Sequence, residues 1–99
     1  ALVEDCAHAQ GTQWRKRGVG SYGDYGTFSF QQSKALTCGE GGIVLCRTRQ
    51  HWHRAYRYHN LGRYEDKGLY DFYVMSSNYR LTDLQGALLS NDGDALMTM

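Results

Sequence analysis

The segment between residues 27 and 46 most constrains what this chain can fold into. Residues 27–30 and 43–46 are short apolar runs rich in aromatic and β-branched side chains, which is typical of strands. The connection between them ends in Gly39-Glu40-Gly41-Gly42, where the backbone can bend sharply or approach another group closely. We therefore predict two strands joined by a loop, with Gly41-Gly42 as the hinge into the second strand.

Three other stretches have weaker patterns. Leu2 and Val3, followed by two acidic residues, indicate the end of a buried strand, and residues 6–10 fit a short helical turn. Residues 11–26 are rich in glycine and are predicted to form a loop. Residues 60–79 are aromatic but have no clear period, so we expect irregular structure there.

Two helices are predicted in the second half of the chain. Thr48 is a suitable N-cap for a helix over residues 49–58, and Thr82 is one for a second helix that ends near Leu89. Asn91-Asp92-Gly93 is a strong turn signal, so we expect the second helix to stop there. The order of elements predicts an α/β fold, and 99 residues allow at most one domain.

The composition limits the classes of partner. The net charge is +1, so nothing favours a nucleic acid, and Arg15-Lys16-Arg17 is expected to be a solvated loop. No apolar run is long enough to span a bilayer. The three cysteines lack a CxxC spacing, which favours a cytoplasmic protein. Mean hydropathy is −0.60, which predicts a thin core, and Ala1-Leu2-Val3 resembles the end of a strand within a longer protein.

Lys34 lies at the predicted end of a strand, in an unusual setting for a lysine. Phe28 and Phe30 precede it, and hydroxyl residues and the glycine-rich turn surround it. A solvated surface charge is the simplest interpretation of any lysine. Burial, however, favours the neutral amine, which is the form that condenses with carbonyl groups to give a Schiff base. Lys34 is therefore a candidate catalytic residue.

Asp5 is the second candidate, because it follows the predicted strand at residues 2–3. The carboxyl ends of strands are where α/β sheets bind their ligands. A carboxylate there could keep a proton on a pyridine nitrogen and so make the ring an electron sink. The alternative is an ordinary aspartate that caps the next turn.

Two other motifs indicate chemistry less strongly. Gly18-Val19-Gly20-Ser21-Tyr22-Gly23 matches GxGxxG, but a dinucleotide site needs a strand before the motif and a helix after it, so a close-packed loop is favoured. His51 and His53 are two residues apart on a predicted helix and face different sides. Cys6 and His8 have no second pair at zinc-finger spacing, so no metal site is predicted.

Successive blocks of the sequence resemble the DegT/StrS sugar aminotransferases. The blocks cover residues 3–11, 23–30, 33–42 and 78–82, and the pattern Ser-x-x-x-x-Lys-x-x-x-x-Gly-Glu-Gly-Gly over residues 29–42 is especially specific. The resemblance runs to about residue 89, whereas residues 90–99 look atypical. It implies that residues 1–99 are part of the large, cofactor-binding domain of a fold type I transferase dependent on pyridoxal 5′-phosphate, with a mixed sheet and flanking helices.

The resemblance also implies a role for each site residue. Lys34 would hold the pyridoxal phosphate as a Schiff base and later carry a proton between the substrate and the cofactor. Asp5 would pair with the pyridine nitrogen, and His8 would lie against the ring or its O3′ side. Ser29 would bind the phosphate. Asn78 would reach the phosphate of the neighbouring subunit's cofactor, because these enzymes build each site across a homodimer.

The implied reaction moves an amino group from glutamate or glutamine to a keto-sugar or keto-cyclitol. The sequence of residues 30–34 resembles that of the branch of this family that uses glutamine and inosose-type cyclitols to make aminoglycosides. Some relatives have a histidine at the position of Lys34 and act as sugar dehydratases, which is one alternative. A catalytically inactive remnant is the other. Arg80 is expected near the site without an assigned role, and the parts of the family outside this chain are expected to be needed for activity.

Overall fold

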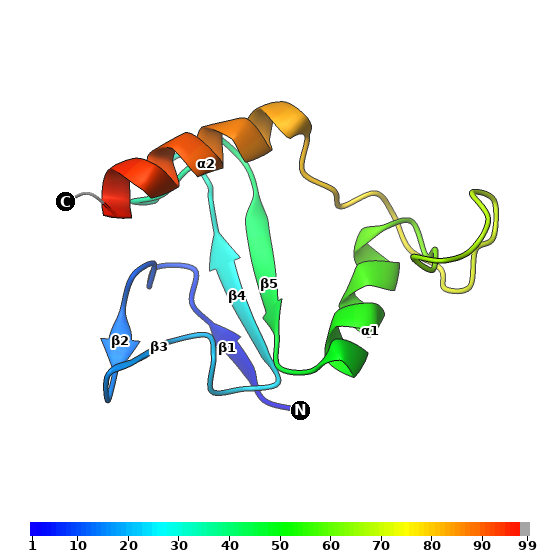
Figure 1. Cartoon of the computed structure of the whole chain (residues 1–99), viewed down its shortest axis with the longest axis horizontal. Helices are drawn as coiled ribbons and strands as arrows, with labels where there is room; N and C mark the ends of the chain where they lie inside the picture. Colours follow the sequence, from blue (N-terminus) through cyan, green and yellow to red (C-terminus); the bar gives the residue numbers. More distant parts are fainter. Residues whose placement is uncertain (98–99) are drawn as a thin grey trace.

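The computed structural model describes residues 1–97 and contains a small sheet, a hairpin and two helices (Figure 1). The elements, in chain order, are β1 (Val3–Asp5), β2 (Gln13–Trp14), β3 (Arg17–Gly18), β4 (Tyr25–Ser29), β5 (Gly42–Cys46), α1 (Arg49–His59) and α2 (Asp83–Met97). The predicted α/β class is correct, with a mixed sheet and helices beside it. The strands β1, β4 and β5 and the N-cap of the first helix were predicted within two residues, since those signals are local.

The sheet has the order β1-β4-β5. β1 runs parallel to β4, with Asp5 opposite Thr27, and β4 runs antiparallel to β5, with Ser29 opposite Gly42. Because β1 and β4 are parallel, their carboxyl ends lie at the same edge of the sheet. The loop after β4 leaves from this edge and returns to it as β5, so residues 30–41 also belong to this edge.

Residues 11–26 contain a hairpin, where only a loop was expected. β2 and β3 pair antiparallel around a two-residue turn, in which Arg15 and Lys16 have φ of 47° and 63°. Positive φ at both central residues is characteristic of a type I′ hairpin turn, which favours Asn and Gly. The Arg15 guanidinium lies 4.4 Å from the ring centre of Trp14. The hairpin was missed because its turn residues carry none of the usual sequence signal.

Two glycines of the GxGxxG segment serve close packing, because a Cβ would lie 2.6 Å from the Phe28 ring at Gly20 and 2.7 Å from the carbonyl oxygen of Leu2 at Gly23. A Cβ at Gly26 in β4 would lie 2.2 Å from the carbonyl oxygen of Gly20, so the two backbones touch. The Glu4 carboxylate accepts N–H bonds from Gly20 at 2.7 Å, from Tyr22 at 2.6 Å and from Gly23. The segment then enters β4 rather than a helix. The packing interpretation is therefore favoured over a dinucleotide site.

Both helices begin at the predicted caps. The Thr48 hydroxyl accepts the N–H of His51 at 3.1 Å, and α1 then packs against β5. The Thr82 hydroxyl accepts the N–H of Gln85 at 3.3 Å, while the Gln85 side chain accepts the N–H of Thr82 at 2.9 Å. This reciprocal pair is the capping box of many helices.

The predicted stop at Asn91-Asp92-Gly93 is wrong, because α2 continues to Met97. An interior glycine costs a helix only about 1 kcal/mol relative to alanine, and each added residue gains one backbone hydrogen bond. A helix that has already formed can therefore run through a sequence that would favour a turn elsewhere.

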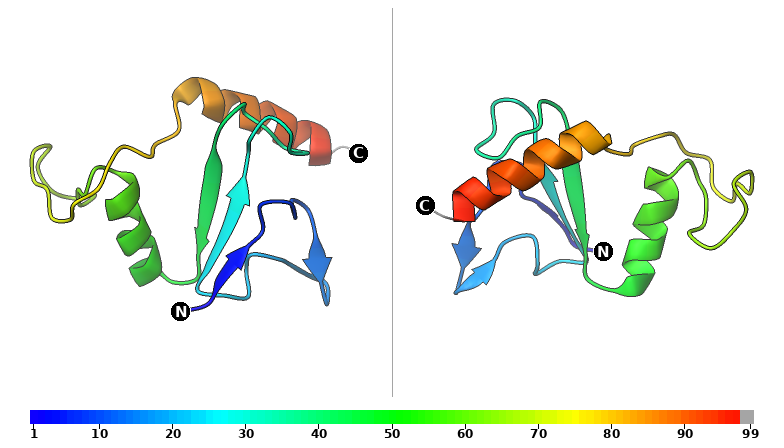
Figure 2. Two further views of the ribbon diagram at one scale, coloured as in Figure 1. Left: turned by 180° about the vertical axis from the view of Figure 1, so that it is seen from behind. Right: turned by 45° about the horizontal axis from the view of Figure 1, so that its top comes forward.

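The core is thin, as the low hydropathy predicted. Cys6, Phe30 and Cys38 are the buried apolar residues of the described chain. By contrast, three consecutive apolar residues of β5 are 39–48% exposed: Ile43, Val44 and Leu45. Figure 2 shows α2 lying across the carboxyl end of β4, while α1 and residues 60–79 extend on the other side of β5. No helix within residues 1–97 is long and apolar enough to cross a membrane.

Candidate functional site

The carboxyl edge of β1 and β4 gathers most of the predicted site. Asp5 ends β1 and Ser29 ends β4, two residues past the Thr27 that pairs with Asp5. The chain continues this pairing into the next turn, because the Cys6 N–H donates to the carbonyl oxygen of Thr27 at 2.8 Å. The ladder of the sheet therefore fixes the backbone on both sides of Asp5.

The turn after β1 places His8 over this edge. The Ala9 N–H donates to the carbonyl oxygen of Cys6 at 3.0 Å, which closes a single turn around His8. The Gln10 side chain reaches across and donates to the carbonyl oxygen of Ser29 at 2.6 Å. This bond ties the turn after β1 to the end of β4, so both segments are held at one place.

Lys34 lies in the loop that joins β4 to β5. Two backbone bonds extend the β4–β5 ladder into this loop, from Phe30 to Gly41 and from Gln32 to Gly39, each 2.8 Å long. Lys34 follows at the tip and is half-buried. Its Nζ lies 3.0 Å from Nε2 and 3.2 Å from Nδ1 of His8. The structure thus brings the amine to the turn that directly follows Asp5.

The Asp5 carboxylate is exposed and only partly used. One oxygen, Oδ1, accepts the N–H of Ala7 at 3.1 Å, which is the capping bond expected from the simpler interpretation. The second oxygen has no hydrogen-bond partner within the part of the chain that the structure describes. Asp5 can therefore cap its turn and still accept a proton-bearing nitrogen.

Ser29 is half-buried and has a hydroxyl hydrogen to spare. Its Oγ accepts the N–H of Gln31 at 3.3 Å, and no acceptor for its own hydrogen is found among residues 1–97. A hydroxyl in this state can donate to an anionic oxygen. The residue stands at the end of a strand, where a small polar group can reach a ligand.

Asn78 lies in a different place from the other four residues. It forms an isolated bridge with Asn60, just past the C-terminal end of α1 and beyond β5 from β1. Its Oδ1 accepts the backbone N–H and the Nε–H of Arg80, each at 3.1 Å. Within one chain, the structure brings together Asp5, His8, Ser29 and Lys34, but it does not bring Asn78 to them.

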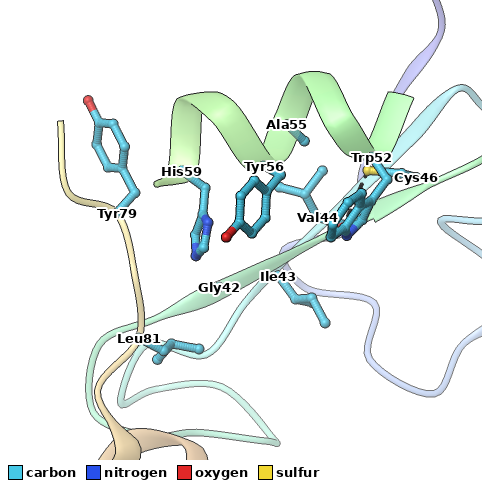
Figure 3. A pocket seen from close by; sticks show the side chains of 10 residues that line it. All are labelled: Gly42, Ile43, Val44, Cys46, Trp52, Ala55, Tyr56, His59, Tyr79 and Leu81. Atoms are coloured by element: carbon cyan, nitrogen blue, oxygen red, sulfur yellow. Dashed lines mark hydrogen bonds between the residues drawn. The ribbon is translucent and has the colours of Figure 1, made fainter. Parts of the chain in front are cut away.

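A separate groove runs between β5 and α1 (Figure 3). Its volume is about 350 Å³. Its lining is mostly apolar and includes Ile43, Trp52, Tyr56, Tyr79 and Leu81. It holds no lysine and no carboxylate, so it offers none of the groups that the predicted chemistry needs. No local pattern marks this groove, because Tyr79 and Leu81 complete it from a segment that is distant in the chain from β5 and α1.

The surroundings of β1 lower the pKa of a carboxylate and raise the pKa values of two thiols. The pKa of Glu4 is lowered, chiefly by the N–H of Gly23 and also by those of Gly20 and Tyr22, against an opposing effect of burial. Burial raises the pKa of the Cys6 and Cys38 thiols, so both stay neutral and weakly reactive. The cysteines therefore do not compete with Lys34 as nucleophiles at this edge.

The sequence as a whole matches one family. The family model described as the DegT/DnrJ/EryC1/StrS aminotransferase family matches residues 1–96. The chain belongs to this family.

Two relatives, one named as an aminotransferase and one as a synthase, show the likeness. The chain is 59% identical over 44 residues, 44% of its length and 10% of the relative's, to an L-glutamine:2-deoxy-scyllo-inosose aminotransferase from Micromonospora echinospora. It is 36% identical over 90 residues, 89% of its length and 23% of the relative's, to a 3-amino-5-hydroxybenzoate synthase from Amycolatopsis mediterranei.

Solved structures agree with this family. An aminotransferase from Psychrobacter cryohalolentis superposes with a TM-score of 0.85 at 30% identity, over 97% of this chain and 27% of that one. The chain thus spans about a quarter of the length of the relatives that it matches along most of its own length.

Proposed function

We propose that this chain is the part of a pyridoxal-phosphate-dependent aminotransferase that holds the reactive lysine and the acid at the pyridine nitrogen. The observation that supports this most strongly is the position of Lys34. Its amine contacts His8, three residues after Asp5, at the carboxyl edge of a mixed sheet. In this proposal, residues 1–99 belong to the large domain of a fold type I enzyme.

The polar groups at this edge fit the cofactor. Lys34 supplies an amine for an aldehyde, Asp5 has a carboxylate oxygen without a partner in residues 1–97, and Ser29 has a hydroxyl hydrogen to donate. The amine would bond to the aldehyde of pyridoxal phosphate, the carboxylate would accept the proton-bearing ring nitrogen, and the hydroxyl would donate to the phosphate. They come from separate segments that the bonds of Cys6 and Gln10 hold together.

The bound cofactor would supply a ring that accepts electrons when a substrate Cα loses its proton. The chain's own residues would control where protons lie. Asp5 would keep the ring nitrogen protonated, because a carboxylate at hydrogen-bond distance favours the charged form of a base. The Lys34 amine, once free, would take and return the Cα proton as a general base. His8 would pack against the ring, and Ser29 would donate to the phosphate.

We further propose glutamine or glutamate as the amino donor and a keto-cyclitol or keto-sugar as the acceptor. The named relative from Micromonospora echinospora takes its amino group from L-glutamine and acts on a deoxy-inosose, by its name. Its 59% identity favours this class for the chain. The complete enzyme would be a cytoplasmic homodimer, with Asn78 serving the site of the neighbouring subunit.

The test is covalent trapping of the cofactor on Lys34. The purified full-length enzyme that contains this chain, loaded with pyridoxal phosphate and reduced with borohydride, should carry the label on the peptide that contains Lys34. Lys34→Ala should lose both the label and amine transfer, the latter by at least about 10²–10⁴-fold from the lost proton transfer alone. Lys67→Ala removes an exposed lysine elsewhere and is the matched control.

Two outcomes would contradict the proposal. A Lys34→Ala protein that still transfers amine at the wild-type rate would remove Lys34 from the chemistry. A labelled wild-type protein that eliminates water from a sugar substrate, without amine transfer, would support the dehydratase alternative instead.

A further inference from the structure

Asn78, Arg80 and Asn60 form a chain of hydrogen bonds beside the end of α1. The Asn78 Oδ1 accepts two N–H groups of Arg80, one from its backbone and one from Nε. The Nη1 of the same guanidinium donates to the Oδ1 of Asn60 at 3.2 Å. The arginine therefore links two asparagine side chains that come from different segments.

The far end of this chain is anchored to a helix. Asn60 is the C-cap of α1, and its backbone N–H donates to the carbonyl oxygen of Tyr56 at 2.9 Å. Its side-chain nitrogen donates to the Tyr56 hydroxyl at 3.1 Å, which leaves its Oδ1 for Arg80. The Tyr79 N–H donates to the carbonyl oxygen of His59 at 3.1 Å. Residues 78–80 are thus held on the last turn of α1 by backbone and side-chain bonds.

This arrangement determines how the Asn78 amide is oriented. An amide has one accepting oxygen and two donating N–H groups, and arginine can only donate. Two Arg80 donors on one side therefore require the amide oxygen on that side and the Nδ2 group on the other. No acceptor for Nδ2 is found among residues 1–97, and Asn78 is exposed. Its N–H groups are available to an anion from outside this segment.

We propose that Arg80 is a positioning residue that orients Asn78 to donate to the phosphate of pyridoxal phosphate. The inference rests on the proposed function, in which that phosphate belongs to the partner subunit's site. Arg80 acts through Asn78: two of its nitrogens, the backbone N and Nε, are used on Asn78, and Nη1 is used on Asn60. Its effect is to prevent the amide from rotating, which would turn the oxygen towards the phosphate and repel it.

The test compares affinities for pyridoxal phosphate and for pyridoxal, which lacks the phosphate. The variants are Asn78→Ala, Arg80→Lys, and the two combined in one protein, all measured by cofactor titration. Arg80→Lys keeps the positive charge but loses the fixed fork of N–H groups. Arg54→Lys, on the exposed face of α1, is the matched control.

Asn78→Ala should lower the affinity for pyridoxal phosphate about 10-fold, the usual scale for a hydrogen bond to a charged group, and leave pyridoxal nearly unchanged. Arg80→Lys should lower several-fold the ratio of the affinity for pyridoxal phosphate to the affinity for pyridoxal. The combined variant should be no weaker than Asn78→Ala alone, because Arg80 has no role without the amide. A general loss of structure would lower both affinities together.

Three results would overturn the inference. Arg80→Lys with the wild-type ratio would show that the amide needs no arginine. A combined variant whose losses multiply would show that Arg80 contacts the phosphate directly. A raised KM for the amino donor with an unchanged ratio would make Arg80 a substrate residue. In each of these cases borohydride would still fix the cofactor on Lys34, whereas failure of that trapping would overturn the proposed function itself.

Discussion

The sheet of β1, β4 and β5 and the connection between α1 and α2 are held by different interactions. In the sheet, β4 pairs along its whole length with β5 and along three residues with β1. The connection has only two isolated bridges, Asn60 with Asn78 and Arg63 with Phe72. Backbone turn bonds and side-chain contacts do the rest, such as the Gly62 N–H to the carbonyl oxygen of Arg57 at 2.7 Å and the Arg57 guanidinium, 3.8 Å from the ring centre of Tyr64.

The difference separates the two halves of the proposed site. The groups near Lys34 stand on backbone ladders, whose geometry hardly depends on individual side chains. Asn78 stands on one isolated bridge and a side-chain network, in a connection whose apolar side chains are largely exposed, Tyr70 at 82% and Met75 at 97%. A sheet can assemble its groups within one chain, whereas an exposed connection can offer a group to another chain. The following substitutions test whether the two regions are independent.

Gly26→Ala should have the largest effect, because it damages the sheet itself. The added Cβ would lie 2.2 Å from the carbonyl oxygen of Gly20, a backbone atom that cannot rotate away. We expect a loss of about 3 kcal/mol or more in the free energy of unfolding, with trapping of the cofactor on Lys34 lost as well. Urea denaturation measures the first and borohydride labelling the second.

Gly18→Ala is the matched control, since nothing lies within 4 Å of the Cβ it would add. It should keep both the wild-type stability and the labelling of Lys34. Equal stability of the Gly26→Ala and Gly18→Ala proteins would refute the close contact between the two backbones.

Gly62→Ala should damage the connection and spare the sheet. Gly62 has a φ of +81°, and a Cβ there would lie 1.9 Å from the carbonyl oxygen of Val74. Left-handed backbone alone costs a residue with a side chain about 1–2 kcal/mol. We expect faster proteolysis within residues 60–79 and a reduced preference for pyridoxal phosphate over pyridoxal, while Lys34 is still labelled. Loss of that label would show that the two regions are coupled.

The same contrast explains what the sequence could predict. The strand at residues 43–46 and the caps Thr48 and Thr82 depend on neighbouring residues, so local patterns found them. The end of α2 was predicted wrongly, because the turn preference of Asn91-Asp92-Gly93 is weaker than the gain from continuing a formed helix.

For the site, the sequence places Asp5 and Lys34 at the ends of predicted strands, which predicted that both would lie at a sheet edge. The contact between Lys34 and His8 could not be predicted, because it depends on how the loop at residues 30–41 folds over the turn after β1. The bond from Arg80 to Asn78 was also missed. An asparagine and an arginine two residues apart form no recognised sequence motif, so nothing in the sequence indicates that one holds the amide of the other.

The Glu4 carboxylate makes the sheet region sensitive to acid. Its folded-state pKa is lowered, first by the N–H of Gly23. The folded protein therefore binds fewer protons than the unfolded chain near the ordinary pKa of a glutamate, about 4.3. Its stabilising effect is full above that pKa and is lost as the pH falls through the folded value.

The melting temperature of the wild-type protein should consequently stay nearly constant down to about pH 4.3 and drop as the pH falls further. Glu4→Gln should have a lower melting temperature at neutral pH and a weaker dependence on pH. Glu65→Gln, which removes an exposed carboxylate from the connection, is the matched control and should keep the wild-type acid sensitivity. If the Glu4 and Glu65 variants melt alike at every pH, the three N–H bonds do not stabilise the sheet.

Gly86→Ala should have the smallest effect, and a favourable one. Gly86 lies inside α2, nothing lies within 4 Å of the Cβ it would gain, and its φ is not positive. Alanine in place of an interior helix glycine should stabilise α2 by about 0.5–1 kcal/mol. The neighbouring Gln85 side chain donates to the carbonyl oxygen of Glu40 at 2.7 Å, so α2 touches the loop that carries Lys34.

If the sheet positions Lys34 by its own ladders, the firmer helix should raise the melting temperature without changing the rate at which borohydride fixes the cofactor. A changed rate with unchanged affinity for pyridoxal would instead show that α2 helps to position the loop at residues 30–41. In that case α2 would belong with the sheet region, and only the connection between α1 and α2 would be independent of it.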